Sequence, residues 1–266
     1  MQYPIGIFRT EYWLWPGMVS GQTQDEVMPV ESNPVLDLRV TQKVMWCLVG
    51  FLVLRSLFAI DTIKRDSATT RTIERIAWMA ENPRDADIEN FPIENFQESA
   101  MENGLRNRWL TLLSFPATVL FLWFLYRAYE NLAFLKVSGQ KYSSVWAVCW
   151  FFIPGLNLIR PFDVMRELWR ASDPAVLDET AWKRSPATPL IAIWWMLFVL
   201  AFFGRPASLL MAASGEIAAV PGIMHANLFF ETLEIPAAIA AIYVVWRIEQ
   251  RQREKYARLI QTGAPA

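Results

Sequence analysis

The sequence is poor in charge and has very little histidine or cysteine. Charged residues make up 19% of its 266 residues, against roughly 25% in an average soluble domain. The formal net charge is −1, so the chain has no basic surplus with which to bind nucleic acid. Two cysteines cannot brace a chain of this length as a disulfide scaffold. These shortages exclude a nucleic-acid-binding arm and a small disulfide-rich fold.

The short motifs of common catalytic and cofactor sites are also missing. The sequence contains no GxxxxGK[ST], GxGxxG, HExxH or GxSxG. The acidic run that starts at Asp85 begins like a calcium-binding loop, but glycine is missing at its sixth position and Phe96 stands at its twelfth. The single histidine, His225, cannot build a zinc site without help. We therefore expect no catalytic residue, no metal and no cofactor, and we expect that the chain is not an enzyme.

Hydrophobic residues are abundant, at 54%, and they are grouped into long windows. Each window is close to the 17–25 residues, approximately, that a helix needs to cross a bilayer. Three windows contain no charged residue, one contains a single arginine, and one contains two glutamates. The windows are 44–60, 109–126, 143–159, 188–204 and 228–246. The sequence predicts an all-α, polytopic membrane helix bundle.

The basic residues orient this bundle. The tail at 249–266 and the residues just before it hold the densest basic cluster in the chain, which places the C-terminus in the cytoplasm by the positive-inside rule. The window 188–204 then runs outward, and 228–246 returns. We expect a multi-pass protein of the inner (plasma) membrane, with the lipid bilayer as its surroundings and no nucleic-acid partner.

The window 143–159 differs from the others because Pro154 and Gly155 interrupt it. Proline removes a backbone donor and glycine frees the backbone, so a continuous helix is disfavoured at this point. Either the segment is re-entrant, giving four spans with both termini inside, or it crosses as a fifth span with the N-terminus outside. Counts of Lys and Arg on the two sides do not decide between these topologies.

Three segments are expected outside the bilayer. Residues 1–43 form a polar segment that we expect to be cytoplasmic, partly flexible and uncleaved, so that the first span stays as an anchor. Residues 61–108 form a soluble loop with a short amphipathic helix at 69–81. In this loop Phe91 and Phe96 occupy equivalent places in a tandem repeat, and they either pack back onto the bundle or offer a strip for a partner.

Three charged residues lie within the predicted spans. They are Arg55 in the first window and Glu231 and Glu234, three residues apart, in the last. A charge in lipid costs about 2.5–3.5 kcal/mol on insertion scales, so such groups normally pair or face water. If the first span runs outward, Arg55 lies at a depth compatible with Glu231. The residues then form an Arg–Glu pair lining a polar path, or a structural pair within the bundle, or the glutamates reach the interface.

One part of the chain has the features of a family signature. It comprises YRAYENL at 126–132, the stretch WAVCWFFIPGLNLIRP at 146–161, and VMRELWRAS at 164–172. This pattern resembles a bacterial membrane protein family catalogued as domain of unknown function 4328. The resemblance is detailed over residues 109–172, extends in hydropathy to Trp246, and leaves out the first forty residues. It implies a membrane protein and no particular activity.

The residues of this signature also predict a local structure. The break frees backbone groups that the Asn157 amide can bind, Arg160 marks the headgroup level, and Pro161 suits the first turn of a new helix. In that helix, at 161–172, apolar side chains such as Met165 and Leu168 share one side, which predicts an amphipathic helix on the inner leaflet. The candidate residues of the broken segment are Trp150, Pro154, Gly155, Asn157, Arg160 and Pro161.

Two functional hypotheses follow. The first is a structural or regulatory membrane protein that acts through contacts with another membrane protein or with a second copy of itself. The second is a small channel or transporter-like protein that uses the broken segment and the charges within the membrane.

Overall fold

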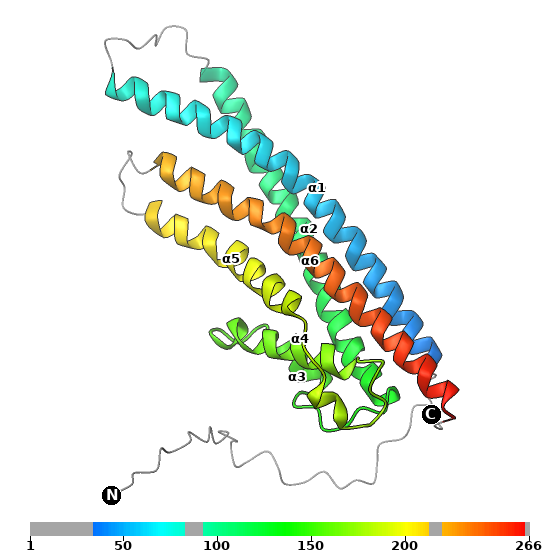
Figure 1. Ribbon diagram of the computed structural model, residues 1–266. Helices are drawn as coiled ribbons and strands as arrows, with labels where there is room; N and C mark the ends of the chain where they lie inside the picture. The colour runs from blue at the N-terminus through cyan, green and yellow to red at the C-terminus, as the bar shows by residue number, and fades with distance from the viewer. Residues whose placement is uncertain (1–33, 83–92, 213–219, 264–266) are drawn as a thin grey trace, which may run out of the picture. The chain divides into compact units, whose positions relative to one another are not determined.

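The computed structural model describes residues 34–82, 93–212 and 220–263, and its regular structure there is entirely helical (Figure 1). Four helices are long: α1 (Pro34–Glu81), α2 (Ile93–Phe134), α5 (Pro189–Ala212) and α6 (Val220–Gln261). Between α2 and α5 lie the short helices α3 (Ser144–Cys149) and α4 (Arg160–Ala171), and the 3₁₀ turns η1 (Leu156–Leu158) and η2 (Ala181–Arg184). The all-α class predicted from the sequence is confirmed.

The long helices pack in a definite order. Helix α1 contacts both α2 and α6, α6 also contacts α5, and α4 contacts α2 and α5 (Figure 1). The beginning of α1 and the end of α6 lie at the end of the bundle that also holds α3 and α4 (Figure 1). Side chains from α1, α2 and α6 bond to one another there, as described below. The long helices thus form an up-and-down bundle, and α3 and α4 lie at one end of it (Figure 1).

Three of these helices are long and apolar enough to cross a membrane, judged by length and composition. The qualifying segments are Leu38–Ile76, Arg108–Phe134 and Gly222–Gln261. Only 22%, 24% and 44% of their most apolar windows is buried, so most of each apolar surface faces outward. The fourth predicted span, 188–204, falls on α5, whose apolar stretch Pro189–Phe202 is shorter.

The segment 61–108, expected as a loop, is helical on both sides of residues 83–92. Helix α1 continues for 48 residues, about 72 Å, to Glu81, and α2 begins at Ile93. The amphipathic helix expected at 69–81 is the last part of α1. Arg65 joins the two helices, since it pairs with Asp61 on α1 and with Glu102 on α2, each at 3.2 Å. The loop prediction was wrong here because polar side chains indicate contact with water and not the end of a helix.

Part of the sequence prediction lies outside the described side chains. This applies to the packing expected of Phe91 and Phe96 and to the segment 1–33. Helix α1 begins at Pro34, ten residues before the predicted first window. Proline suits the first turn of a helix, since its missing N–H would have had no partner within the helix there.

The broken segment is not a continuous helix. Helix α3 has six residues, about 9 Å, which is far short of a bilayer core of about 30 Å. It is followed by turns, by η1 and by α4. Gly155, the residue before η1, has φ = 78° and ψ = −45°, a conformation that other residues rarely adopt. The segment is therefore a short helix followed by turns, and not one continuous helix of the length that a bilayer requires.

Replacing Gly155 by alanine is expected to lower the free energy of unfolding by about 2 kcal/mol through backbone strain. No atom lies within 4 Å of the added Cβ, so steric overlap is not the cause. The matched control is Gly50→Ala in α1, where the added Cβ also meets open space and the backbone is helical. That variant should be neutral or stabilising by up to about 1 kcal/mol. Unfolding followed by circular dichroism in detergent measures both, and equal effects would refute the strain argument.

Helix α4 packs its apolar side on protein. Val164, Met165 and Leu168 are 0–1% exposed and belong to the same core as Leu125 and Val244. The helix was expected to bury this side in the inner leaflet. Amphipathic spacing indicates that one side avoids water, but it does not distinguish a lipid surface from the side of a helix bundle.

Candidate functional site

Two of the three charges within the predicted spans, Arg55 and Glu234, form an ion pair. Arg55 Nη2 lies 2.6 Å from Glu234 Oε2, and Arg55 Nε donates a 2.8 Å hydrogen bond to Ser114 Oγ. The three residues come from α1, α6 and α2, and the ion-paired side chains are 20% and 10% exposed. Because a charge pair that is mostly buried loses most of its hydration, each charge depends on the other. The contact ties three helices together at one depth.

The sequence placed Arg55 at a depth compatible with Glu231. In the structure its partner is Glu234, which lies about one helical turn further along α6. Glu231 is 8% exposed and precedes Glu234 by three residues on α6, so both carboxylates are on the same side of the helix. Whether the pair lines a polar path or only holds the bundle together stays a prediction.

The end of the bundle beside α4 contains a buried polar network that we call the α4 junction. It consists of Thr41, Asn131, Ser172, Gln252 and Lys255, each 0–1% exposed. Asn131 Nδ2 donates to Thr41 Oγ1 at 3.0 Å and to Gln252 Oε1 at 3.1 Å. Gln252 Nε2 donates to the carbonyl of Ala128 at 2.9 Å and to Ser172 Oγ at 3.2 Å. The junction thus connects α1, α2, α6 and the end of α4.

Two cations of α6 bind the C-terminal end of α4. Lys255 Nζ donates to the carbonyl of Ala171 at 2.9 Å. The guanidinium of Arg251 lies 4.6 Å from the ring centre of Trp169, donates to the Trp169 carbonyl at 3.3 Å, and pairs with Asp173 at 3.4 Å. Cations are favourable at this end of a helix, where carbonyls have no partner in the helix. These basic residues, which orient the chain in the sequence analysis, also fix α4 in place.

The junction was missed in the sequence analysis. A signal for part of it exists, because Ile248, Gln252, Lys255 and Leu259 follow one another at helical spacing and are all buried. This stripe continues the apolar side of α6 past Trp246, where the chain turns basic. Two polar residues within such a stripe indicate buried hydrogen bonds.

The broken segment is held against α5 by an indole group. Trp195 Nε1 donates to the carbonyl of Leu158 at 2.8 Å. The Asn157 amide was expected to bind the freed backbone groups, but the structure gives this role to Trp195, which comes from a helix 37 residues further on. Pro161 lies in the first turn of α4 as predicted, and it is buried.

Arg160 and Trp150 lie together at the exit of this segment. The Arg160 guanidinium is 5.4 Å from the ring centre of Trp150, and its Nη1 is 3.5 Å from the Tyr142 hydroxyl. Pro154 and Gly155 are exposed, so the turn that they form points away from the core. The structure brings Trp150 and Arg160 together and leaves Pro154 and Gly155 at the tip.

Glu167 on α4 fixes the chain that leads into α3. Its carboxylate accepts hydrogen bonds from the backbone N–H groups of Lys141, at 3.0 Å, and Tyr142, at 3.3 Å. Burial raises the pKa of Glu167 above its ordinary value of 4.5, and the hydrogen bonds from these two N–H groups oppose that shift. The folded protein therefore holds a proton on this carboxyl more readily than the unfolded chain does.

Glu167→Gln is expected to reduce the pH dependence of stability. Because folding raises the pKa of this carboxyl, the folded wild type gains stability as the pH falls from neutral through the raised pKa, and the gain is complete below about 4.5, the unfolded value. Glutamine cannot titrate, so the stability of wild type relative to the variant should rise over that interval. Thermal unfolding at several pH values measures the difference. A difference that falls toward pH 4.5 would contradict the expected sign.

These features define a class of protein: an all-helical chain with three helices that are able to cross a membrane. The segment between α2 and α5, residues 135–188, which we call the cap, covers one end of the bundle, and polar side chains form hydrogen bonds and an ion pair between the helices. Comparison with family models gives the particular family. The chain belongs to the family described as domain of unknown function (DUF4328), whose model matches residues 103–250. The match includes α2 from residue 103, the cap, α5 and most of α6, and it confirms the resemblance seen in the sequence. No curated protein and no solved structure matches the chain.

Proposed function

We propose that this chain is a multi-pass membrane protein with four crossings that acts through contacts with another membrane protein. The carrying observation is the outward apolar surface of every long helix. Large apolar side chains are between 59% and 73% exposed on each of the four, and examples are Leu57, Phe115, Met196 and Ile239. Water does not tolerate so much apolar surface, whereas lipid and a partner helix both accept it.

Helix α5 is included as the fourth crossing in this proposal. Its 24 residues are about 36 Å long, and the helix packs along α6. A protein with α1, α2, α5 and α6 all crossing has both described ends, α3 and α4 on one side. The basic tail supports the cytoplasm as that side.

We also propose that the chain has no catalytic activity of its own. Its support is the use made of the polar groups within the bundle: Arg55 and Glu234 bind each other, and Gln252 and Lys255 bind neighbouring helices. These contacts hold helices together, as expected of a scaffold or a regulatory subunit.

A channel or transporter-like protein is the second candidate, and the ion pair at membrane depth is the observation that favours it. Against it, α3 and α4, which flank the break, lie at one end of the bundle (Figure 1), whereas Arg55 and Glu234 lie within the long helices α1 and α6. Broken helices in transporters lie near the midplane. Solute flux through vesicles that contain only this chain, abolished by Glu234→Gln or Glu231→Gln, would favour this candidate over the first.

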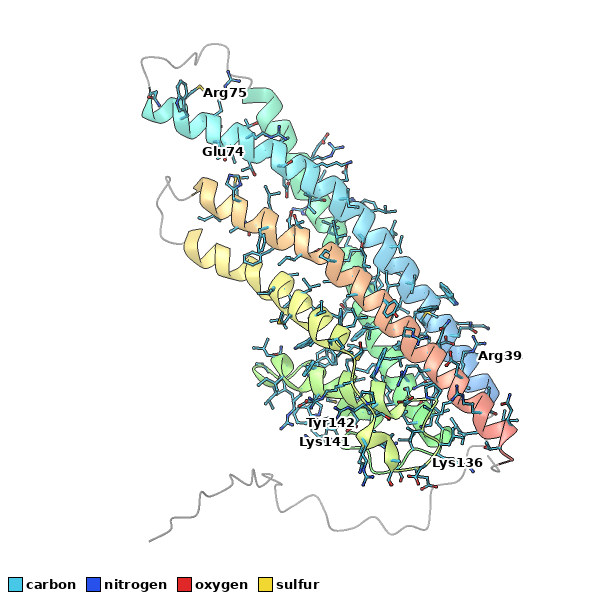
Figure 2. All side chains as sticks on the ribbon, in the orientation of Figure 1. Arg39, Glu74, Arg75, Lys136, Lys141 and Tyr142 are labelled. Atoms are coloured by element: carbon cyan, nitrogen blue, oxygen red, sulfur yellow. The ribbon has the colours of Figure 1, made fainter. Side chains whose placement is uncertain are left out.

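Topology can be tested with single cysteines placed at the two ends of the bundle. Figure 2 shows Arg75 at one end of α1, and Lys141, beside Tyr142, at the other end of the bundle. Arg75, Lys141 and Glu254 are all exposed. Arg75→Cys, Lys141→Cys and Glu254→Cys are introduced separately after the native Cys47 and Cys149 are replaced by serine. An impermeant maleimide applied to intact cells should label position 75 and spare 141 and 254. Labelling of 141 but not 75 would indicate five crossings instead.

Partner contact can be tested with a photoreactive amino acid at Leu57, which is 59% exposed, and at the control position Ala59, which is 4% exposed. In native membranes, position 57 should crosslink to one defined polypeptide, either another protein or a second copy of this chain. Position 59 should crosslink only within the chain. Lipid adducts alone at position 57 and at other outward positions would contradict the proposal.

A further inference from the structure

The part of the cap that lies between α2 and α4 exposes apolar side chains, and no other described residue covers them. Residues 144–159, which we call the cap turn, include six large hydrophobic residues that are 39% to 67% exposed. They are Val145, Trp146, Phe152, Leu156, Leu158 and Ile159. This is a high density of exposed apolar surface for sixteen consecutive residues without a single charge.

The cap turn is anchored on its other side. Trp195 binds the Leu158 carbonyl at 2.8 Å, and the Phe151 ring packs edge-on against Phe121 of α2 and Trp195 of α5, with ring centres 5.7 and 6.3 Å apart. The backbone is therefore held to the bundle while the apolar side chains point away from it. The exposed surface belongs to a fixed element of the fold.

An aromatic cluster with a cation lies at the end of this surface. Trp146 and Trp150 have ring centres 5.2 Å apart, and Trp150 also contacts the ring of Tyr142 at 6.4 Å. Arg160 stacks over Trp150 at 5.4 Å. Tryptophan and tyrosine are the residues that favour the boundary between hydrocarbon and headgroups, so the cluster indicates the depth at which Arg160 lies.

The charge of Arg160 is not neutralised by the carboxylates near it in the described part of the chain. Asp163, in the first turn of α4, pairs with Arg166 at 2.8 Å. Glu167 accepts the backbone N–H groups of Lys141 and Tyr142. The contacts of Arg160 are the Trp150 ring and a 3.5 Å approach to the Tyr142 hydroxyl, and neither carries a negative charge.

We propose that the cap turn and Arg160 form a binding site for the phosphate headgroup of an anionic phospholipid, in the leaflet on the α3–α4 side. The exposed apolar side chains enter the acyl region, and the Arg160 guanidinium binds the phosphate. A planar guanidinium offers a fork of donors that matches phosphate oxygens, and stacking on Trp150 fixes its plane. Apolar contact alone accepts any lipid, and the cation adds the preference for anionic lipid.

The headgroup site rests on the proposed membrane location, and the experiment below tests each of these two proposals separately. The full chain, purified in detergent, is titrated with phosphatidylglycerol or with phosphatidylcholine of the same acyl chains, and bound lipid is counted by native mass spectrometry. Phosphatidylglycerol should bind more tightly. Arg160→Gln should weaken phosphatidylglycerol binding about tenfold. It should weaken phosphatidylcholine binding less, because the choline cation of that headgroup already compensates the charge of its phosphate. Arg160→Lys, which keeps the charge without the fork, should have an intermediate effect.

The matched control is Arg184→Gln, which removes an exposed cation of η2, also in the region between α2 and α5. It should change phosphatidylglycerol binding by less than about twofold. Equal binding of the two lipids by wild type, or equal losses in the Arg160 and Arg184 variants, would overturn the site. Extraction of membranes with alkaline carbonate distinguishes failure of the headgroup site from failure of the membrane proposal. A chain released by carbonate refutes the membrane proposal itself, and a retained chain without lipid preference refutes only the headgroup site.

Discussion

Arg55→Leu is expected to lower the free energy of unfolding by about 3 kcal/mol. The change removes the guanidinium that lies 2.6 Å from Glu234, whose side chain is 10% exposed, and it also removes the bond to Ser114. Glu234 then remains mostly buried without that cation. Removing one partner of a buried pair typically costs about 3–5 kcal/mol, because the remaining charge is left in apolar surroundings. Unfolding in mixed detergent micelles, followed by circular dichroism, measures the loss.

Two further variants show whether the loss comes from the isolated charge. Arg55→Leu combined with Glu234→Leu removes both charges and should recover most of the lost stability. Arg65→Leu removes an arginine whose ion pairs are half exposed, and it should change stability by less than about 1 kcal/mol. A single Arg55 variant as mild as the Arg65 variant would show that the pair does not stabilise the bundle.

Gln252→Ala is expected to lower the free energy of unfolding by about 3 kcal/mol. It breaks the bonds from Gln252 to the Ala128 carbonyl and Ser172, takes an acceptor from Asn131, and leaves a cavity at a site that is 1% exposed. Lost buried hydrogen bonds cost about 1–3 kcal/mol, and the cavity adds to that cost. The measurement is the same detergent unfolding.

The control for this variant is Gln250→Ala on the same helix. Gln250 is partly exposed and accepts a 3.3 Å bond from Arg247, so its loss should cost less than about 0.5 kcal/mol. Gln252→Leu separates the two causes, since leucine refills much of the volume and makes no hydrogen bond. If Gln252→Leu were as stable as wild type, the polar network would contribute no stability and only the volume would matter.

The helical class and the approximate position of the helices that are able to cross a membrane follow from the sequence, because an uncharged window of this length has few other solutions. The closeness of Arg55 to a carboxylate of α6 also follows, since a charge at that depth needs a partner. The choice of Glu234 over Glu231 does not. These residues are one turn apart, and only the vertical offset between two packed helices decides which one meets Arg55.

The α4 junction could not be predicted for a different reason. Asn131 bonds to residues 90 and 121 positions away, so its role depends on how four helices meet. The bond from Trp195 to the Leu158 carbonyl was missed for the same reason, since it joins residues 37 positions apart. The helix at 69–81 was predicted, but its continuity with the first window was missed because hydropathy reports the surroundings of a segment and not its backbone.

The place of the ion pair along its helices has a mechanical consequence. Pro116 follows Ser114 by two residues in α2, and Pro236 follows Glu234 by two residues in α6. Each proline removes one backbone bond of its helix, which makes bending easier at that level. Helix α1, which contributes Arg55, has no proline after its first residue. The contacts of Arg55 therefore join the three helices at a level where α2 and α6 each lack a backbone hydrogen bond and α1 does not, which favours bending of α2 and α6 over bending of α1 there.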